Sequence, residues 1–437
     1  MKRKLFSVAA FALVAILQAQ QIKFEEYDLP NGLHVILHQD NSAPVVTTGV
    51  MYHVGAKDEE KGRSGMAHFF EHLLFEGTPN IPRGEWMKLV SANGGYNNAN
   101  TSSDRTYYFE TFPSQNQQIG LWMEAERLRH AVINQIGVDT QREVVKEEKR
   151  MNLDNQPYGN LFGKILENLF TNHPYHNSTI GSMEDLNAAT LEEFQAFYKK
   201  YYAPNNATLV VAGDIDPSQT KKWIQTYFGY LPTSEIAAKN FPKDEPITTA
   251  KEATAYDANI QLPAYVFAYR APSNKERDSY ILDMISTYLS TGKSSVLYKK
   301  LVDQEKKALQ VGAINEAMEE SGVFAFFAIP MGSTTKDILI KDIDAEVNKL
   351  QTELISQEDY QKLQNQFENE FVNQNSSIQG IASTLATYHV LHGDTHLINK
   401  TLDIIRGITR EDIRDAAKKY LNGNQRLILN YLPESNK

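Results

Sequence analysis

The sequence predicts an α+β protein made of two duplicated α/β sandwich domains, each with a mixed sheet flanked by helices. The first observation is size, because 437 residues that are 41% hydrophobic can form two cores of roughly 200 residues each. The second is that segments with apolar residues at every second position alternate with long helical patterns. The third is that a stretch of the first half recurs in the second half.

The repeat is clearest near the end of each half. The segment TLEEFQAFYKKYYAPNNATLVV at 190–211 aligns without gaps with TREDIRDAAKKYLNGNQRLILN at 409–430. Both predict a helix, a turn and an apolar strand. The openings also correspond, since strands are expected at 45–56 and 263–272, each followed by an apolar helix. We therefore expect a first domain at 20–231, a polar linker at 232–258 and a second domain at 259–437.

The first nineteen residues are expected to lie outside both domains. Three basic residues at 2–4 precede an apolar run at 5–17, and Ala19 provides a small residue for cleavage. This pattern predicts a signal peptide at 1–19 and a periplasmic or secreted protein. The run is short for a bilayer span, although an uncleaved anchor is the alternative. No other segment is apolar enough to cross a membrane.

Composition excludes several classes of partner and site. The formal net charge is −10 and there is no basic tract, so nucleic acid is not expected as a partner. The chain contains no cysteine, which rules out disulfides and thiolate zinc sites. Any metal site must therefore be built from His, Asp and Glu.

The stretch GMAHFFEHLLFEGTP places two histidines and a glutamate in an apolar segment. A helix is expected here, with Ser64 as N-cap and Gly77 just past its end. Residues three and four apart share a helical face, so His68, Glu71 and His72 form one polar stripe. A helix that is apolar on its other sides is normally buried. Buried titratable groups are costly unless something pairs with them, so the stripe needs a partner.

A catalytic zinc takes three protein ligands and keeps a fourth position open, so two histidines require a third ligand. In the helix expected at 139–152, Glu148 shares a face with Val144 and Met151, which predicts that it points into the core. Pairing with a buried cation is the alternative role for this glutamate. The corresponding helix of the second half, at 281–292, has no histidine, so a metal is expected in the first half only.

Further segments extend the pattern around the His-x-x-Glu-His motif at 68–72. Glu148 follows 76 residues after the motif, and GGYNNANTSSDRTYY at 94–108, PYHNSTIGSMEDL at 174–186 and APNNATLVVAGDID at 203–216 accompany it. Together they resemble the pitrilysin/insulinase family of inverzincin zinc metallopeptidases. The length resembles the half-length branch of that family, which includes processing-type peptidases of mitochondria and bacteria.

The resemblance implies one Zn²⁺ per chain, with His68, His72 and Glu148 as ligands and Glu71 as the general base. The implied function is a zinc-dependent endopeptidase that hydrolyses peptides or unfolded polypeptide segments in an enclosed chamber. A non-catalytic scaffold subunit is the alternative, although the zinc residues that such relatives lose are all present here. A metal-dependent hydrolase of a non-peptide substrate is a third hypothesis, but nothing here resembles a phosphate- or sugar-binding element.

The resemblance also implies where a peptide binds. Asn98 and Ala99 are expected on an edge strand beside the metal, where an extended peptide adds by main-chain hydrogen bonds. A turn residue is the alternative for Asn98. Many relatives carry a second glutamate seven residues before the zinc glutamate. Gln141 stands there in this chain, and we expect it to orient Glu148 by a hydrogen bond.

The second half departs from the family pattern in one respect. Active relatives carry an Arg and, seven residues later, a Tyr that hold the substrate and stabilise the oxyanion. In the segment LYKKLVDQEKKALQVGA, the aligned positions are Val302 and Leu309, and neither side chain can donate a hydrogen bond. We therefore predict a heterodimer with a homologous subunit that carries an intact Arg/Tyr pair, with a homodimer as the alternative.

Overall fold

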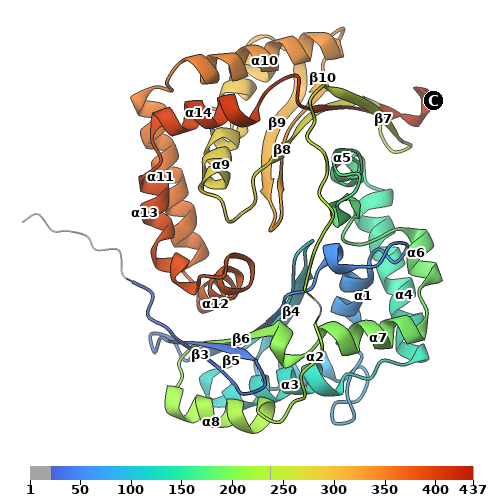
Figure 1. The fold of residues 1–437 in the computed structure, drawn as a ribbon, viewed down its shortest axis with the longest axis vertical. Coiled ribbons are helices and arrows are strands. Elements are labelled where there is room, and N and C mark those ends of the chain that lie inside the picture. The colour runs from blue at the N-terminus through green and yellow to red at the C-terminus, as the bar shows by residue number, and fades with distance from the viewer. Residues whose placement is uncertain (1–20, 237, 437) are drawn as a thin grey trace, which may run out of the picture.

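The computed structural model describes residues 21–236 and 238–436, which form two halves, each built on one sheet (Figure 1). The predicted signal peptide at 1–19 lies outside the described residues. The first sheet has the order β1-β2-β6-β3-β5-β4, in which β2 and β6 are the parallel pair. Its strands are β1 (Glu25–Asp28), β2 (His34–Gln39), β3 (Val45–Tyr52), β4 (Tyr96–Thr101), β5 (Thr106–Pro113) and β6 (Ala207–Gly213).

The second sheet repeats this arrangement with one strand fewer at its edge. Its order is β7-β11-β8-β10-β9, and β7 and β11 are the parallel pair. Two mixed sheets with flanking helices confirm the predicted α+β class. The strands are β7 (Lys251–Asp257), β8 (Ala264–Ala271), β9 (Ala308–Ala317), β10 (Gly322–Pro330) and β11 (Leu427–Pro433).

Helices surround both sheets (Figure 1). Those of the first half are α1 (Met66–Leu73), α2 (Trp86–Ala92), α3 (Gln117–His130), α4 (Gln135–Lys149), α5 (Leu161–Leu169), α6 (Met183–Ala188), α7 (Leu191–Tyr201) and α8 (Pro217–Phe228). Those of the second half are α9 (Arg277–Ser290), α10 (Lys336–Thr352), α11 (Gln357–Gln374), α12 (Ile378–Thr387), α13 (Thr401–Arg406) and α14 (Arg410–Tyr420).

Short helical segments of other types connect or extend these helices. They are η1 (Ala56–Asp58), η2 (Ser114–Asn116), η3 (Arg150–Asp154), η4 (Pro174–His176), η5 (Pro204–Asn206), η6 (Tyr298–Gln304), η7 (Tyr388–His392), η8 (Thr395–Asn399) and η9 (Glu434–Asn436). Of these, η3 continues α4 directly and η7 continues α12.

The internal repeat is visible in the order and capping of the elements. Strand β8 begins and ends 219 residues after β3, and α14 begins and ends 219 residues after α7. Both helices start with a capping box, in which the N-cap hydroxyl accepts from the backbone amide at N3 and the N3 carboxylate accepts from the N-cap amide. The pair is Thr190 and Glu193 in α7, and Thr409 and Asp412 in α14. By the same chain order, α4 corresponds to α11 and α5 corresponds to α12.

Each sheet is covered on one face by helices of its own half and on the other by a helix from the opposite half. Helix α12 of the second half packs its Leu385 and Ala386 on β3, β5 and β6. In return, α5 of the first half packs Leu166 and Leu169 on β8, β10 and β11 (Figure 1). Because strand side chains alternate between faces, Val210 faces α12 whereas Leu209 faces the core of its own half.

The connection between the halves is shorter than the predicted linker at 232–258. Strand β7 occupies the last third of that range and pairs with β11 over its whole length, so these residues belong to the second sheet. The described residues between Leu231 and Lys251 form no helix or strand. Among the described residues, no helix combines the length and apolar character that a membrane crossing requires.

Candidate metal centre

Helix α1 carries the polar stripe on a buried apolar helix. Phe69, Phe70 and Leu73 are fully buried in the core of the first half, on the sides of the helix away from the stripe. The side chains of His68 and His72 are 11% and 23% exposed, so both are shielded from bulk water. The packing of the phenylalanines therefore fixes which side of α1 the two imidazoles occupy.

The start of α1 differs from the expectation. Gly65, not Ser64, is the N-cap, with a left-handed φ of 88°. A β-carbon at Gly65 would lie 2.5 Å from the carbonyl oxygen of Ile180, so only glycine fits. The hydroxyl of Ser64 instead donates to Asp185. The helix also ends at Leu73, with Leu74 as its C-cap, so Gly77 lies four residues past the last helical residue and not just past its end.

Glu148 reaches the two histidines from α4. Its Oε2 lies 3.1 Å from Nε2 of His72 and 3.6 Å from Nε2 of His68. One ligand atom from each of these three residues lies within 4.8 Å of the others. The structure thus brings together the three residues that the sequence proposed as metal ligands.

The face of α4 that carries Glu148 does not point into the core, so this prediction was wrong. Val144 and Met151, which share its helical face, are 44% and 59% exposed, so this face of α4 is not a core face. The fully buried side chain of this segment is Val145. Glu148 itself is 33% exposed, and it points to the histidines from a surface that solvent reaches.

The donor set fits a catalytic zinc ion. Two imidazole nitrogens and one carboxylate oxygen form a three-ligand set that leaves one coordination position for water or substrate. Burial, assisted by the neighbouring His72, lowers the pKa of His68 to about 4, so its imidazole is neutral at pH 7 as a metal ligand requires. The hydrogen bond with His72 lowers the pKa of Glu148, which keeps that group an anion.

Glu71 lies on the same stripe but outside the ligand cluster. Burial raises the pKa of its carboxyl group, and a hydrogen bond from the hydroxyl of Thr101 opposes this rise. The Thr101 Oγ1 to Glu71 Oε2 distance is 2.7 Å. Thr101 was not predicted, because it lies on β4 and no sequence spacing relates a strand to the helix beside it.

Strand β4 is the edge strand of the first sheet, as expected for the segment that contains Asn98 and Ala99. It pairs with β5 alone among the described strands, so its other side can accept a further strand. Asn98 is exposed and its side-chain oxygen accepts from the amide of Ala99 at 2.9 Å, whereas Ala99 is buried. Because Thr101 of the same strand contacts Glu71, β4 runs beside the polar stripe.

Gln141 does not contact Glu148, which corrects the expectation for this residue. Its amide donates to Oε1 of Glu76, at 2.5 Å. Glu76 also pairs with Arg83. Gln141 therefore joins α4 to the loop after α1, two turns away from the ligand cluster, and it stabilises the packing of α4 on that loop.

Two buried ionisable side chains hold the ends of α1, and neither was predicted from the sequence. The carboxylate of Glu59 accepts from the backbone amides of Gly65 and Ala67, at 2.9 Å each. At the other end, the guanidinium of Arg127 donates to the carbonyl of Leu74 at 3.1 Å, and it is fully buried beside Glu110. Burial raises the pKa of Glu59, and the two backbone hydrogen bonds oppose this rise, whereas the cation at the C-terminus matches the helix dipole.

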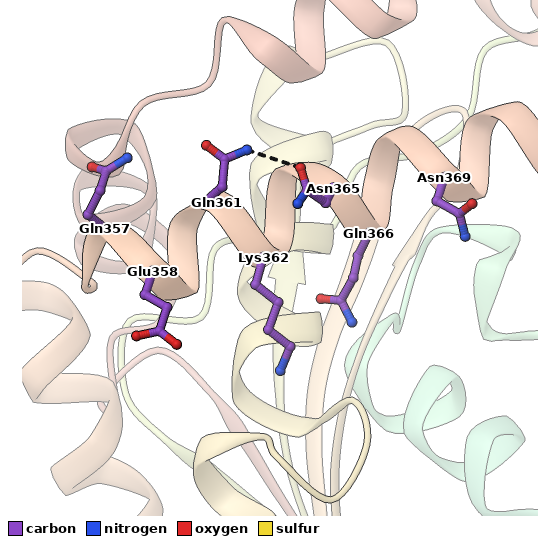
Figure 2. A pocket seen from close by; sticks show the side chains of 7 residues that line it. All are labelled: Gln357, Glu358, Gln361, Lys362, Asn365, Gln366 and Asn369. Carbon is purple, nitrogen blue, oxygen red and sulfur yellow. Dashed lines mark hydrogen bonds between the residues drawn. The ribbon is translucent and has the colours of Figure 1, made fainter.

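The second half carries no polar side chain at the two positions that align with the Arg/Tyr pair, Val302 and Leu309. Leu309 lies on the edge strand β9 and is 48% exposed, and Val302 packs partly against the core of its half. A surface hollow on α11, the counterpart of α4, lies apart from the predicted site residues (Figure 2). It is lined by one polar helix face: Gln357, Glu358, Gln361, Lys362, Asn365, Gln366 and Asn369.

Comparisons with known proteins agree with this geometry. A family model described as "Insulinase (Peptidase family M16)" matches residues 34–183, and one described as "Peptidase M16 inactive domain" matches residues 188–367. The zinc protease PqqE of Helicobacter pylori is 32% identical over 408 residues, which cover 92% of this chain and 92% of that protein. The chain belongs to peptidase family M16, the insulinase family.

Solved and more distant relatives support the same assignment. The crystal structure of a protease from Helicobacter pylori has a TM-score of 0.87 and 30% identity, and the match covers 94% of this M16 chain and 100% of that one. The probable mitochondrial-processing peptidase subunit beta of Arabidopsis thaliana is 22% identical over 402 residues, which cover 90% of this chain and 75% of that protein. The predicted half-length M16 family and the predicted enzyme class, a zinc metallopeptidase, are confirmed.

Proposed function

We propose that this M16 chain is a zinc-dependent endopeptidase that cleaves extended peptides or unfolded polypeptide segments. The observation that carries the proposal is the convergence of His68, His72 and Glu148, with Glu71 beside them and an edge strand alongside. The alternative of a non-catalytic scaffold is not favoured, because none of these groups is missing or displaced.

Each group has a distinct task in the proposed reaction. A zinc ion held by the three ligands supplies Lewis acidity toward water and the peptide carbonyl. Glu71 accepts a proton from the attacking water and passes it to the leaving amine, a role that suits a carboxylate whose pKa burial raises. Thr101 holds Glu71 in place for both transfers.

The peptide is expected to bind to β4 as an added strand. The free edge of β4 offers main-chain donors and acceptors along Tyr96–Thr101, with Asn98 and Ala99 in the middle. Binding by main-chain hydrogen bonds requires an extended segment but reads little of its sequence. This accounts for a preference for unfolded substrate and for cleavage within a chain.

A partner subunit is part of the proposal. Val302 and Leu309 cannot donate hydrogen bonds to a developing oxyanion, so we propose that a homologous chain with an Arg/Tyr pair completes the site, with a homodimer as the alternative. Mixing the two purified homologues should raise kcat/KM by about 100- to 1000-fold, the usual cost of one missing oxyanion donor. Full activity of this chain alone would contradict the heterodimer.

We also propose export to the periplasm or the medium, directed by residues 1–19.

The decisive experiment compares metal content with turnover. Glu71→Gln should retain zinc at the His68, His72 and Glu148 cluster while cleavage of a quenched peptide falls by several orders of magnitude. A chelator should abolish cleavage by the unmodified chain, and added zinc should restore it. Loss of zinc in Glu71→Gln, with an unchanged Tm, would show that Glu71 is a ligand and would overturn the proposed roles.

A further inference from the structure

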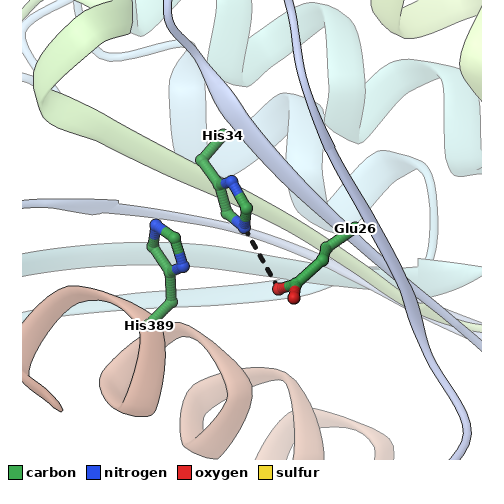
Figure 3. A group of neighbouring side chains, drawn as sticks. All are labelled: Glu26, His34 and His389. Carbon is green, nitrogen blue, oxygen red and sulfur yellow. Dashed lines mark hydrogen bonds and ion pairs between the residues drawn. The ribbon is translucent and has the colours of Figure 1, made fainter. Parts of the chain in front are cut away.

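A second group of metal-ligand side chains lies where the two halves meet, remote in sequence from the first. His34 is on β2, Glu26 is on the neighbouring strand β1, and His389 is on η7 of the second half (Figure 3). One ligand atom from each lies within 4.8 Å of the others. The group therefore draws donors from both halves of the molecule.

Each imidazole has a partner at Nδ1, so Nε2 is the nitrogen that is left to bind a metal. Nδ1 of His34 lies 2.8 Å from Oδ1 of Asp28, and Nδ1 of His389 lies 3.4 Å from the hydroxyl of Thr395. The remaining Nε2 of His34 lies 3.3 Å from Oε2 of Glu26. A carboxylate on the far nitrogen is the usual support of a metal-bound histidine, because it fixes the tautomer and the ring orientation, and Asp28 gives His34 this support.

We propose that Glu26, His34 and His389 form a second divalent-metal site, suited to zinc, that joins the first half of the chain to the second. Two imidazoles and a carboxylate are ligands that zinc accepts readily. The three protein donors leave the fourth coordination position to water.

One ring has to turn when the metal binds. The imidazoles of His34 and His389 are stacked, with centroids 3.5 Å apart and 5° between their planes, so their in-plane lone pairs run parallel (Figure 3). Rotation of the His389 ring about its Cβ–Cγ bond lets both nitrogens point to one ion. His389 is the ring that is free to turn, since its contact with Thr395 is long whereas His34 is held at both nitrogens.

The place of the site determines what the metal would do. Helix α12, which η7 continues, already packs on the first sheet through Leu385 and Ala386. An ion beside this contact would tie β1 and β2 to η7 and so stabilise the folded chain in proportion to its affinity. The site is separate from the peptidase cluster on α1 and α4, so it goes beyond the proposed function.

Metal counting with matched variants tests the proposal. The full mature chain is stripped with a chelator, reloaded with zinc at pH 7.5, dialysed and analysed by mass spectrometry. We expect two zinc ions per chain, one in Glu148→Gln, one in His389→Ala, and none in the double variant. Glu26→Gln keeps the stacked rings and should also lose one ion. His130→Ala, which alters a histidine outside both clusters, is the control and should keep two.

Thermal unfolding supplies a readout that does not depend on activity. Zinc should raise the Tm of Glu148→Gln, and this increase should vanish when His34→Ala is added. A single zinc in the unmodified chain that Glu148→Gln removes and His389→Ala retains, or two zinc ions in both His389→Ala and Glu26→Gln, would overturn the proposal. His34 would then only link Asp28 and Glu26 through its two ring nitrogens. Failure of the proposed peptidase function would appear in the cleavage assay instead, and the zinc that His389→Ala removes would still be bound.

Discussion

Thr101 on the edge strand β4 donates a hydrogen bond to Glu71 on the metal helix α1, with 2.7 Å between the hydroxyl and the carboxylate oxygen. This contact links the strand on which a peptide would bind to the group that would move the proton. It makes Thr101 a positioning residue, because its effect on the reaction passes through Glu71.

Thr101→Val should lower kcat/KM about tenfold at unchanged zinc content. The variant keeps the shape of the side chain but removes one hydrogen bond to a carboxylate, and one such bond is worth ~1.4 kcal/mol in a rate. Steady-state cleavage of a quenched peptide provides the measurement. Thr101→Ser restores the hydroxyl and should restore the rate, whereas a rate for Thr101→Val equal to that of the unmodified chain would contradict the role.

Glu148→Gln should weaken zinc binding by more than about 100-fold, because removal of a direct ligand costs more than removal of its supporting partners. Glu147→Gln is the matched control, since Glu147 points outward, is 58% exposed and pairs with Arg150 at 2.9 Å. Competition against a fluorescent zinc chelator measures both. Equal effects of the two substitutions would refute the assignment of the third ligand.

Glu59→Ala should lower the Tm by several degrees. It removes the acceptor of two buried backbone amides at the start of α1, and each unsatisfied amide costs about 1–3 kcal/mol. Zinc affinity should fall as well, because the first turn of α1 carries His68. The neighbouring Glu60 is exposed, so Glu60→Ala should leave both quantities unchanged. Calorimetry with and without zinc distinguishes the two variants.

Asp283→Asn should stabilise the chain in a pH-dependent manner. Burial raises the pKa of Asp283 to about 6, so the folded state disfavours its charge. Below pH 3.8 the group is protonated in both states and the substitution should have no effect. As the pH rises to about 6, the unmodified chain loses stability relative to Asp283→Asn, and the difference then stays constant, at most ~3 kcal/mol. A Tm difference that does not change between pH 4 and 7 would disprove this.

Because unfolding of a chain with two halves need not be two-state, the calorimetric Tm is compared at each pH in place of an extrapolated free energy.

Local patterns in the sequence predicted much of the fold. The 219-residue repeat predicted that α7 corresponds to α14 and β3 to β8. Helix caps and alternating apolar residues can be recognised from a few neighbouring positions in the sequence. The linker was predicted too long, since the polar segment before β7 gives no sign of where pairing with β11 begins. Strand pairing depends on a partner far along the chain, which local periodicity does not encode.

The candidate site was predictable where helical spacing applies and unpredictable elsewhere. His68, Glu71 and His72 share a stripe by their spacing alone. Thr101, Glu59 and the partner of Gln141 became visible only in the structure, because each depends on a contact between separate elements. The expected burial of its helical face did not identify Glu148, because Val144 and Met151 on that face are exposed. The resemblance to the family did identify it as the third ligand.

The exchange of α5 and α12 between the halves limits how the chain can have evolved by duplication and whether its halves can fold as separate fragments. A polypeptide carrying one repeat unit would leave the apolar face of its sheet open to water, because the helix that should cover it packs on a different sheet. Two identical copies could cover each other by trading this helix around a two-fold axis, as in a domain-swapped dimer. Once the two copies are fused into one chain, the same exchange of helices takes place within a single molecule. Neither half should be recoverable as a soluble fragment, and separately expressed halves should fold only when they are produced together.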